Sequence, residues 1–251
     1  MEDSALVRGQ EITMRFGGVV ALSKVSFEIR PEEIVGLIGP NGSGKTTLFN
    51  VLTGVLRPTA GRVTVLGRDV TGWRPHRIAR RGVGRTFQIP APFAKATVLE
   101  NLMVAASASK AESLNRARSL LDTFDLDGLS EEWAESLDSG HLRLLELARA
   151  LMRDPQVILL DEPTSGVDPA LLDHLLERIH AMHAEGRAIC VVAHDMRAIE
   201  DVCERVVVLD QGQVIAEGSF HEVRQNPNVV DAYLGGTART WLTSTIGGAG
   251  G

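Results

Sequence analysis

The chain has 251 residues, of which 44% are hydrophobic, so it is long enough to form one large domain or two small ones with a full core. Its formal charge of −6 argues against a protein that coats nucleic acid, because such proteins usually carry a basic surplus. We therefore expect no nucleic-acid partner.

Cysteine usage and hydropathy indicate the compartment in which the chain works. Cys190 lies in an apolar run and Cys203 in a helical pattern, which predicts buried free thiols and a reducing environment. No apolar run approaches the roughly 20 residues of a membrane helix, and the start Met1-Glu2-Asp3 is unlike a secretion signal. We expect a soluble, cytoplasmic protein.

The first part of the chain predicts strands around one helix. Residues 11 to 30 alternate between apolar and polar side chains and predict two strands, Ile12 to Phe16 and Lys24 to Ile29, joined by a turn at Gly17-Gly18. The segments that follow are a buried strand over Glu33 to Ile38, a helix over Thr47 to Leu52 and a strand over Gly61 to Gly67.

Between Trp73 and Phe87 the chain is locally basic, in contrast to its overall charge. The basic residues are Arg74, His76, Arg77, Arg80, Arg81 and Arg85. Such a cluster fits a surface that faces anionic lipid headgroups or an acidic partner, and it also fits a solvated helix face, which we favour.

The pattern changes from about Gln88 to Leu151, where strand signals stop. Helical spacing predicts a mostly helical insertion with three helices, over Val98 to Ala106, Glu112 to Phe124 and Leu142 to Met152.

Apolar strands return in the last third of the chain. They cover Val157 to Leu160, Ala188 to Ala193 and Arg205 to Leu209, and a hairpin through Gln211-Gly212 adds Gln213 to Ala216. A helix is predicted after Asp168, which suits the N-cap, with Gly186 at its end. Continuous apolar strands separated by helices imply a parallel sheet covered on both faces. Residues 236–251 are rich in Gly, Thr and Ser and predict a flexible tail.

One segment points directly to chemistry, because its spacing G-x-x-x-x-G-K-T is what a loop needs to wrap the phosphates of ATP or GTP. It reads Gly39-Pro40-Asn41-Gly42-Ser43-Gly44-Lys45-Thr46-Thr47. Glycines let consecutive backbone N–H groups turn toward an anion, and the helix that follows adds its positive end. Lys45 reaches the β and γ phosphates, and Thr46 offers a hydroxyl to a phosphate-bound Mg²⁺.

A second constellation lies at the end of the strand over Val157 to Leu160, where Asp161 and Glu162 follow directly. Asp161 is predicted to hold Mg²⁺, directly or through water, and Glu162 to polarise the water that attacks the γ phosphate. Apolar strands often end in acids, so the acid pair alone is a weak indication of a nucleotide site. It becomes a strong one in combination with Lys45 and Thr46.

From about residue 8 to 235 the chain closely resembles an ATP-binding cassette (ABC) ATPase. The resemblance implies an α/β P-loop NTPase fold with a RecA-like parallel-sheet core, an antiparallel β subdomain and a helical subdomain. It implies a single domain over 1–235, with the core at about 1–87 and 151–235 and the helical subdomain at about 88–150. ATP and Mg²⁺ are the implied cofactors.

The resemblance assigns further residues. Phe16 stands where the family stacks an aromatic ring on adenine, although a core phenylalanine at a strand end is the alternative. Gln88 stands where the family's glutamine contacts Mg²⁺, and His194 where its histidine contacts the γ phosphate. The loop that crosses the family's dimer interface matches Ser165, Gly166, Val167 and Asp168.

The family's signature segment, typically Leu-Ser-Gly-Gly-Gln, is altered in this chain. Here it reads Leu137, Asp138, Ser139, Gly140 and His141. The resemblance places this segment across a dimer interface from the other subunit's γ phosphate. At about 4 Å and an effective dielectric of 20, a carboxylate is repelled by one phosphate charge by roughly 4 kcal/mol, which exceeds the helix-dipole benefit. We expect a weakened site across from Asp138, with a harmless variation as the alternative.

The insertion is too short for the long coiled-coil arm of an ABC protein that acts on DNA, and only one cassette is present, unlike ribosome-associated factors. The segments Gly82 to Gln88, Thr97 to Leu102 and Asn226 to Gly235 are similar to the ATP subunits of branched-chain amino acid importers. Lipopolysaccharide-export ATPases, which share parts of this pattern, and non-transport ABC ATPases are the alternatives.

The resemblance implies membrane permease subunits, a second ATP-binding subunit in a heterodimer or homodimer, a periplasmic solute-binding protein, and a location at the inner face of the membrane.

Overall fold

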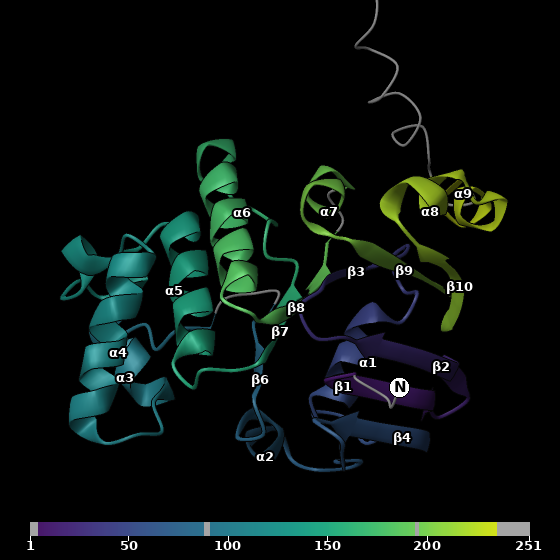
Figure 1. Cartoon of the computed structure of the whole chain (residues 1–251), viewed down its shortest axis with the longest axis horizontal. Helices are drawn as coiled ribbons and strands as arrows, with labels where there is room; N and C mark the ends of the chain where they lie inside the picture. Colours follow the sequence, from purple (N-terminus) through teal and green to yellow (C-terminus); the bar gives the residue numbers. More distant parts are fainter. Residues whose placement is uncertain (1–4, 88–90, 194–195, 235–251) are drawn as a thin grey trace, which may run out of the picture.

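The computed structural model of this chain describes residues 5–87, 91–193 and 196–234 (Figure 1). Its strands form two sheets. The four-stranded antiparallel sheet has the order β2-β1-β4-β5. Its strands are β1 (Val7–Phe16), β2 (Val19–Ile29), β4 (Ala60–Val65) and β5 (Arg68–Asp69).

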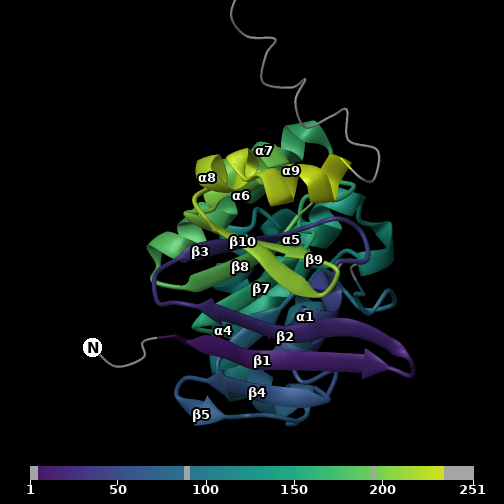
Figure 2. The same cartoon turned by 90° about the vertical axis from the view of Figure 1, so that its right-hand side faces the viewer.

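The six-stranded sheet has the order β10-β9-β3-β8-β7-β6 and lies above the antiparallel sheet in Figure 2. Its strands are β3 (Ile34–Ile38), β6 (Val83–Arg85), β7 (Val157–Asp161), β8 (Ala188–Val192), β9 (Arg205–Asp210) and β10 (Gln213–Gly218). All neighbours pair in parallel except the hairpin β9-β10. This confirms the predicted parallel sheet and the hairpin beside it.

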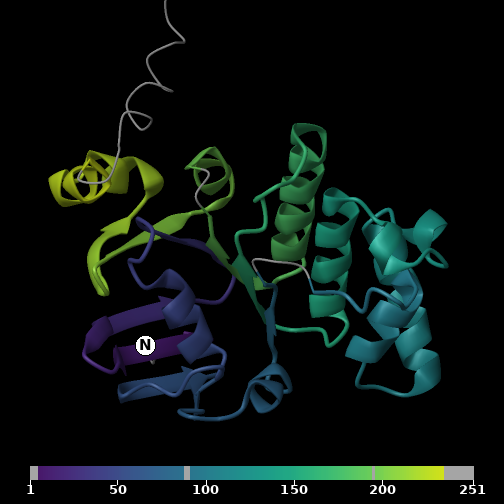
Figure 3. The same cartoon turned by 180° about the vertical axis from the view of Figure 1, so that it is seen from behind.

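Helices cover both faces of the parallel sheet. They are α1 (Lys45–Leu52), α2 (Pro75–Ala79), α3 (Val98–Ala105), α4 (Lys110–Thr123), α5 (Ser139–Leu151), α6 (Pro169–Ala184), α7 (Met196–Val202), α8 (Phe220–Gln225) and α9 (Pro227–Leu234). Helices α3, α4 and α5 gather at one end of the molecule, opposite the antiparallel sheet, as Figures 1 and 3 both show. Short 3-10 helices over Asp127–Leu129 and Ala134–Ser136 lead into α5.

The core consists of two apolar clusters on opposite faces of the parallel sheet. Alternate residues of β3 divide between them, since Ile34 and Ile38 join the cluster with the helices α3 to α6, while Val35 and Leu37 join the cluster with α1 and the antiparallel sheet. This division follows from the two-residue period of a strand. It explains why β3, β8 and the first four residues of β7 are apolar and why all three strands are fully buried.

The cysteines lie where their neighbours in sequence predict. Cys190 and Cys203 are both free and buried, which confirms the expectation of structural thiols. Burial raises the pKa of the Cys203 thiol to about 12 and that of Cys190 well above its ordinary value. Both thiols are therefore protonated and unreactive at neutral pH.

Among the described residues, eight elements were not predicted, namely β5, β6, α2, α7, α8, α9 and the two 3-10 helices. Each is two to eight residues long, so an apolar period has little room to show. Strand β1 also begins earlier than expected, at Val7. No helix within 5–87, 91–193 and 196–234 has the length and apolar character needed to cross a membrane.

Candidate active site

The glycine-rich loop connects β3 to α1 and is shaped by its glycines. The φ angle is +147° at Gly39, +82° at Gly42 and +110° at Gly44. A Cβ on Gly39 would lie 2.0 Å from the backbone oxygen of Leu209, and one on Gly44 would lie 2.8 Å from the oxygen of Ala21. Because α1 has no side-chain cap at Gly44, its first N–H groups remain available for a ligand.

Lys45 lies across this loop. Its ammonium donates hydrogen bonds to the oxygens of Gly39 at 2.8 Å and Pro40 at 3.0 Å, and the side chain is buried. Burial lowers the pKa of Lys45, while the nearby carboxylates of Glu162 and Asp161 act to raise it. The structure therefore brings together the lysine of the loop and the acid pair, which are more than a hundred residues apart in sequence.

The acid pair ends β7 at the carboxyl edge of the parallel sheet. Asp161 is 2% exposed, and its Oδ2 accepts a hydrogen bond from Arg85 at 3.1 Å. Burial raises the pKa of Asp161 against the opposing effect of Arg85. Glu162 has a φ of +50°, and its N–H donates to Val192 at 2.7 Å, so the neighbouring strand holds the sharp turn after Asp161.

The donor set fits an oxygen-coordinated cation and a phosphate chain. Within the described part of the chain, Asp161 Oδ1 and Ser43 Oγ are buried and have no hydrogen-bond partner. Thr46 follows Lys45 directly, and its side chain is exposed. Carboxylate and hydroxyl oxygens are the ligands that Mg²⁺ prefers, and a buried polar atom without a partner is costly unless a ligand satisfies it.

The segment from Leu137 to His141 forms the start of α5. Asp138 is the N-cap, and its Oδ1 accepts the backbone N–H of His141 at 2.9 Å. Its Oδ2 lies 2.7 Å from His141 Nδ1. The backbone N–H of His141 is the main cause that lowers the pKa of Asp138. Gly140 is buried against α6, since a Cβ there would lie 2.2 Å from Leu171 Cδ1.

The loop over 165–168 leaves the acid pair and leads into α6. Ser165, Gly166 and Asp168 are exposed, whereas Val167 is half-buried. Gly166 has a φ of +71°. The loop begins close to Glu162, whose carbonyl accepts the N–H of Ser165 at 3.2 Å.

Phe16 ends β1 and is 47% exposed, which excludes the alternative of a core phenylalanine. The hairpin that follows it packs against the glycine-rich loop, because Ala21 and Leu22 are the residues that a Cβ on Gly44 would meet. An exposed ring at this place is available for stacking.

Gln88 and His194 lie outside the described residues. The residue before Gln88 is anchored from α5, since Phe87 N–H donates to Glu146 Oε1 at 2.7 Å and its carbonyl accepts from Arg143 at 2.9 Å. Arg143 and Glu146 are themselves a buried ion pair with 3.1 Å between Nη1 and Oε2.

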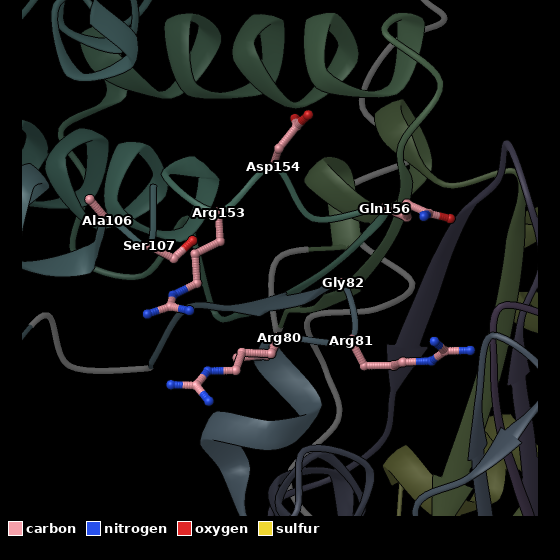
Figure 4. Close-up of a pocket in the computed structure, with 9 residues that line it drawn as sticks. Arg80, Arg81, Gly82, Ala106, Ser107, Arg153, Asp154 and Gln156 are labelled. Atoms are coloured by element: carbon pink, nitrogen blue, oxygen red, sulfur yellow. The ribbon is translucent and has the colours of Figure 1, made fainter. Parts of the chain in front are cut away.

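The locally basic segment does not act as one cluster, which corrects the grouping made from sequence. A hollow of about 610 Å³ is lined by residues that include Arg80, Arg153 and Ser107. Figure 4 shows the side chains of these three residues extending to the same side. Arg81 turns the other way and donates to the Leu66 carbonyl at 3.0 Å. Arg85 lies inside the molecule beside Asp161 and is the site residue that sequence reasoning missed.

Comparisons with known proteins agree with this geometry. A family model described as ABC transporter matches residues 22–165, and one described as branched-chain amino acid ATP-binding cassette transporter matches residues 213–239. The chain is 37% identical over 245 residues to a probable branched-chain amino acid transport ATP-binding protein LivG of Archaeoglobus fulgidus, covering 92% of this chain and 95% of that one.

Solved structures extend the comparison to the fold. The ADP conformation of MJ1267, an ATP-binding cassette of an ABC transporter, superimposes with a TM-score of 0.85 at 32% identity, covering 93% of this chain and 100% of that chain. A dimeric post-hydrolysis state of the cassette MJ0796, bound to ADP and Pi, has a TM-score of 0.76 at 26% identity, covering 85% of this chain and 98% of that chain. The chain belongs to the family of ABC transporter ATPases, and the α/β cassette with its P-loop is the fold of that family.

Proposed function

We propose that this chain is the ATP-binding subunit of a membrane importer for branched-chain amino acids. The observation that carries the solute class is the match of residues 213–239 to a family model described by that solute. The LivG relative has the same role in its name and is similar over nearly the whole chain. The relation to other ABC ATPases alone does not distinguish solutes, because fold does not fix function.

In this proposal ATP binds with its phosphates in the glycine-rich loop. Lys45 gives up its two loop carbonyls to bind the β and γ phosphates, and the N–H groups at the start of α1 surround the same oxygens. Thr46, Asp161 and Gln88 hold Mg²⁺, which when bound neutralises charge on the phosphate oxygens. Phe16 stacks on the adenine.

Glu162 is the residue that we assign to the hydrolysis step. Its backbone is held by hydrogen bonds to Val192 and Ser165 directly after β7. There it polarises the attacking water, and His194 contacts the γ phosphate. Lys45 lies close enough to both acids for their charges to raise its pKa, so the three groups share one site.

The partners follow from the importer assignment. We infer permease subunits in the membrane, a second cassette and a periplasmic solute-binding protein, with this chain at the inner face of the membrane. A dimer of cassettes is the state described for MJ0796. Ser165 to Asp168 then form the loop between the two cassettes.

Leucine, isoleucine and valine uptake by whole cells tests the solute assignment. Deleting the gene should abolish saturable uptake of labelled leucine at low external concentration, and the wild-type gene should restore it. A gene with Lys45→Met should not restore uptake. Unchanged uptake of all three amino acids in the deletion strain, with loss of uptake of another solute, would contradict the assignment.

Asp138 makes the signature segment an acidic one. Its carboxylate accepts the backbone N–H of His141 and lies beside the His141 ring, and these contacts offset part of the repulsion between Asp138 and a partner's phosphates. A heterodimer would place one such segment at one of two sites, whereas a homodimer would have it at both. Because only one of the two sites is weakened in a heterodimer, we favour a heterodimer with an intact signature segment on the second cassette.

Replacing Asp138 with serine should raise the steady-state ATPase rate of the purified chain. We expect a gain of about fivefold, which corresponds to about 1 kcal/mol of relieved repulsion after the contacts to His141 and solvent screening. Asp127→Ser is the matched control, because Asp127 is also exposed and lies at the start of a short helix. An Asp138→Ser rate equal to that of the wild type would count against a weakened site.

A further inference from the structure

Arg85 is an arginine inside the molecule that the sequence groups with surface residues. It ends β6, the strand next to β7, and its side chain is 9% exposed. A buried guanidinium is costly unless hydrogen bonds and an opposite charge offset its desolvation. Both Nη atoms of Arg85 have partners, whereas its Nε is buried without one among the described residues. The contacts of Arg85 therefore show what the protein holds in place with it.

The guanidinium joins two parts of the site. Its Nη2 donates to Asp161 Oδ2 at 3.1 Å. Its Nη1 donates to Asn50 Oδ1 at 2.7 Å and Thr53 Oγ1 at 2.9 Å. Asn50 lies on α1, the helix that begins at Lys45, and Thr53 caps its other end. Arg85 thus links the acid of β7 to the helix of the phosphate loop.

Two aromatic rings fix the orientation of this fork. The guanidinium carbon lies 5.8 Å from the ring centre of Phe49 and 5.0 Å from that of Phe87. Thr53 is itself oriented, since its hydroxyl donates to the Phe49 carbonyl at 2.7 Å. A planar group that lies near two rings and donates from both Nη atoms has little freedom, and a lysine ammonium lacks this planar shape.

The two oxygens of Asp161 are consequently unequal. Oδ2 is bound by Arg85, whereas Oδ1 is buried with no partner among the residues that the structure describes. The carboxylate cannot turn about its last bond without losing the contact to Arg85. Its second oxygen is therefore held at the carboxyl edge of the sheet, close enough to Lys45 and Glu162 for both to act on it electrostatically.

We propose that Arg85 is a positioning residue, which holds Asp161 by Oδ2 so that Oδ1 is presented to the phosphate-bound Mg²⁺. The proposal rests on the proposed function, because it concerns the metal of that same site. Asn50 on α1 orients Arg85, and Arg85 orients Asp161, so the glycine-rich loop and the acid form one rigid unit.

The test compares ATP affinity with and without the metal. Calorimetry on the full chain gives the Kd for ATP in EDTA and in excess Mg²⁺. The Kd in EDTA divided by the Kd in Mg²⁺ is the gain in ATP affinity that the metal provides. We expect Arg85→Met to change the Kd in EDTA by less than about twofold and to lower the ratio by about tenfold, the value of one hydrogen bond to a charged group. Asn50→Leu should lower the ratio in the same direction, and the double variant should match Arg85→Met.

Arg80→Met is the matched control, because Arg80 is an exposed arginine of the same segment, and its ratio should equal that of the wild type. Circular dichroism checks folding. If Arg85→Met does not fold, Arg85→Lys takes its place. The ratio should then fall by about threefold, because the ammonium keeps the charge but not the planar set of N–H donors.

The outcomes separate this proposal from the assigned function. A wild-type ratio of one would mean that Mg²⁺ adds nothing to ATP affinity, which would contradict the metal site of the proposed function. A wild-type ratio above one with the same value in the folded Arg85 variant would overturn the positioning role alone. A higher ratio in the variant would also overturn it, because Arg85 would then compete with the metal instead of presenting the acid.

Discussion

Replacing Glu162 with glutamine is expected to lower the steady-state ATPase rate by about a hundredfold or more, which is the usual contribution of a positioned general base. The amide has the same shape and keeps the buried turn after β7 intact, so the Kd for ATP should change little. The rate is measured by phosphate release and the Kd by calorimetry.

A matched variant separates charge loss at the site from charge loss in general. Glu177 is exposed on α6, and Glu177→Gln should leave the rate unchanged. A Glu162→Gln rate within about threefold of the wild type would show that another group activates the water. Loss of ATP binding in that variant would instead assign Glu162 to binding.

Replacing Gly39 with alanine is expected to destabilise the fold and to remove ATP binding together. The new Cβ would lie 2.0 Å from the Leu209 carbonyl, which belongs to the backbone of β9 and cannot move without disturbing the parallel sheet. The φ of +147° is also a region that alanine avoids. We expect a loss of about 3 kcal/mol or more in the free energy of unfolding, measured with urea.

Gly42→Ala is the control for this prediction, because Gly42 lies in the same loop with a φ of +82° and a Cβ added there would have no neighbouring atom within 4 Å. Only the backbone term remains there, so the cost should be about 1 kcal/mol. Equal costs for the two variants would show that the contact with β9 is not what requires glycine at position 39.

The sequence predicts the elements whose burial is complete. Strands β3 and β8 and the first four residues of β7 are apolar because both faces of the sheet are covered. Helix α6 shows its stripe because Leu175, Ile179 and Met182 all enter the core. Strand β6 has only three residues, one of them Arg85, so no apolar pattern identifies it. Its place in the sheet comes from pairing with β7, which is a tertiary contact.

The site was predictable where its chemistry depends on spacing along the chain. The loop and the acid pair each have their own local pattern, and the structure places them together. Arg85 was not predictable, because an arginine in a basic segment gives no sign of burial and its partners, Asn50 and Asp161, are 35 and 76 residues away. The contact between Asp138 and His141 was not predictable for a different reason. The two residues are only three apart, but the sequence does not determine the orientation of the His141 ring.

A crystal structure of the Glu162→Gln variant with Mg·ATP would show whether the loop after β3 and the acids after β7 form one nucleotide site. We expect Lys45 to leave the Gly39 and Pro40 carbonyls for the γ phosphate, with the metal between Thr46 and Asp161 Oδ1. A nucleotide bound elsewhere, with Lys45 still on the two carbonyls, would contradict this site.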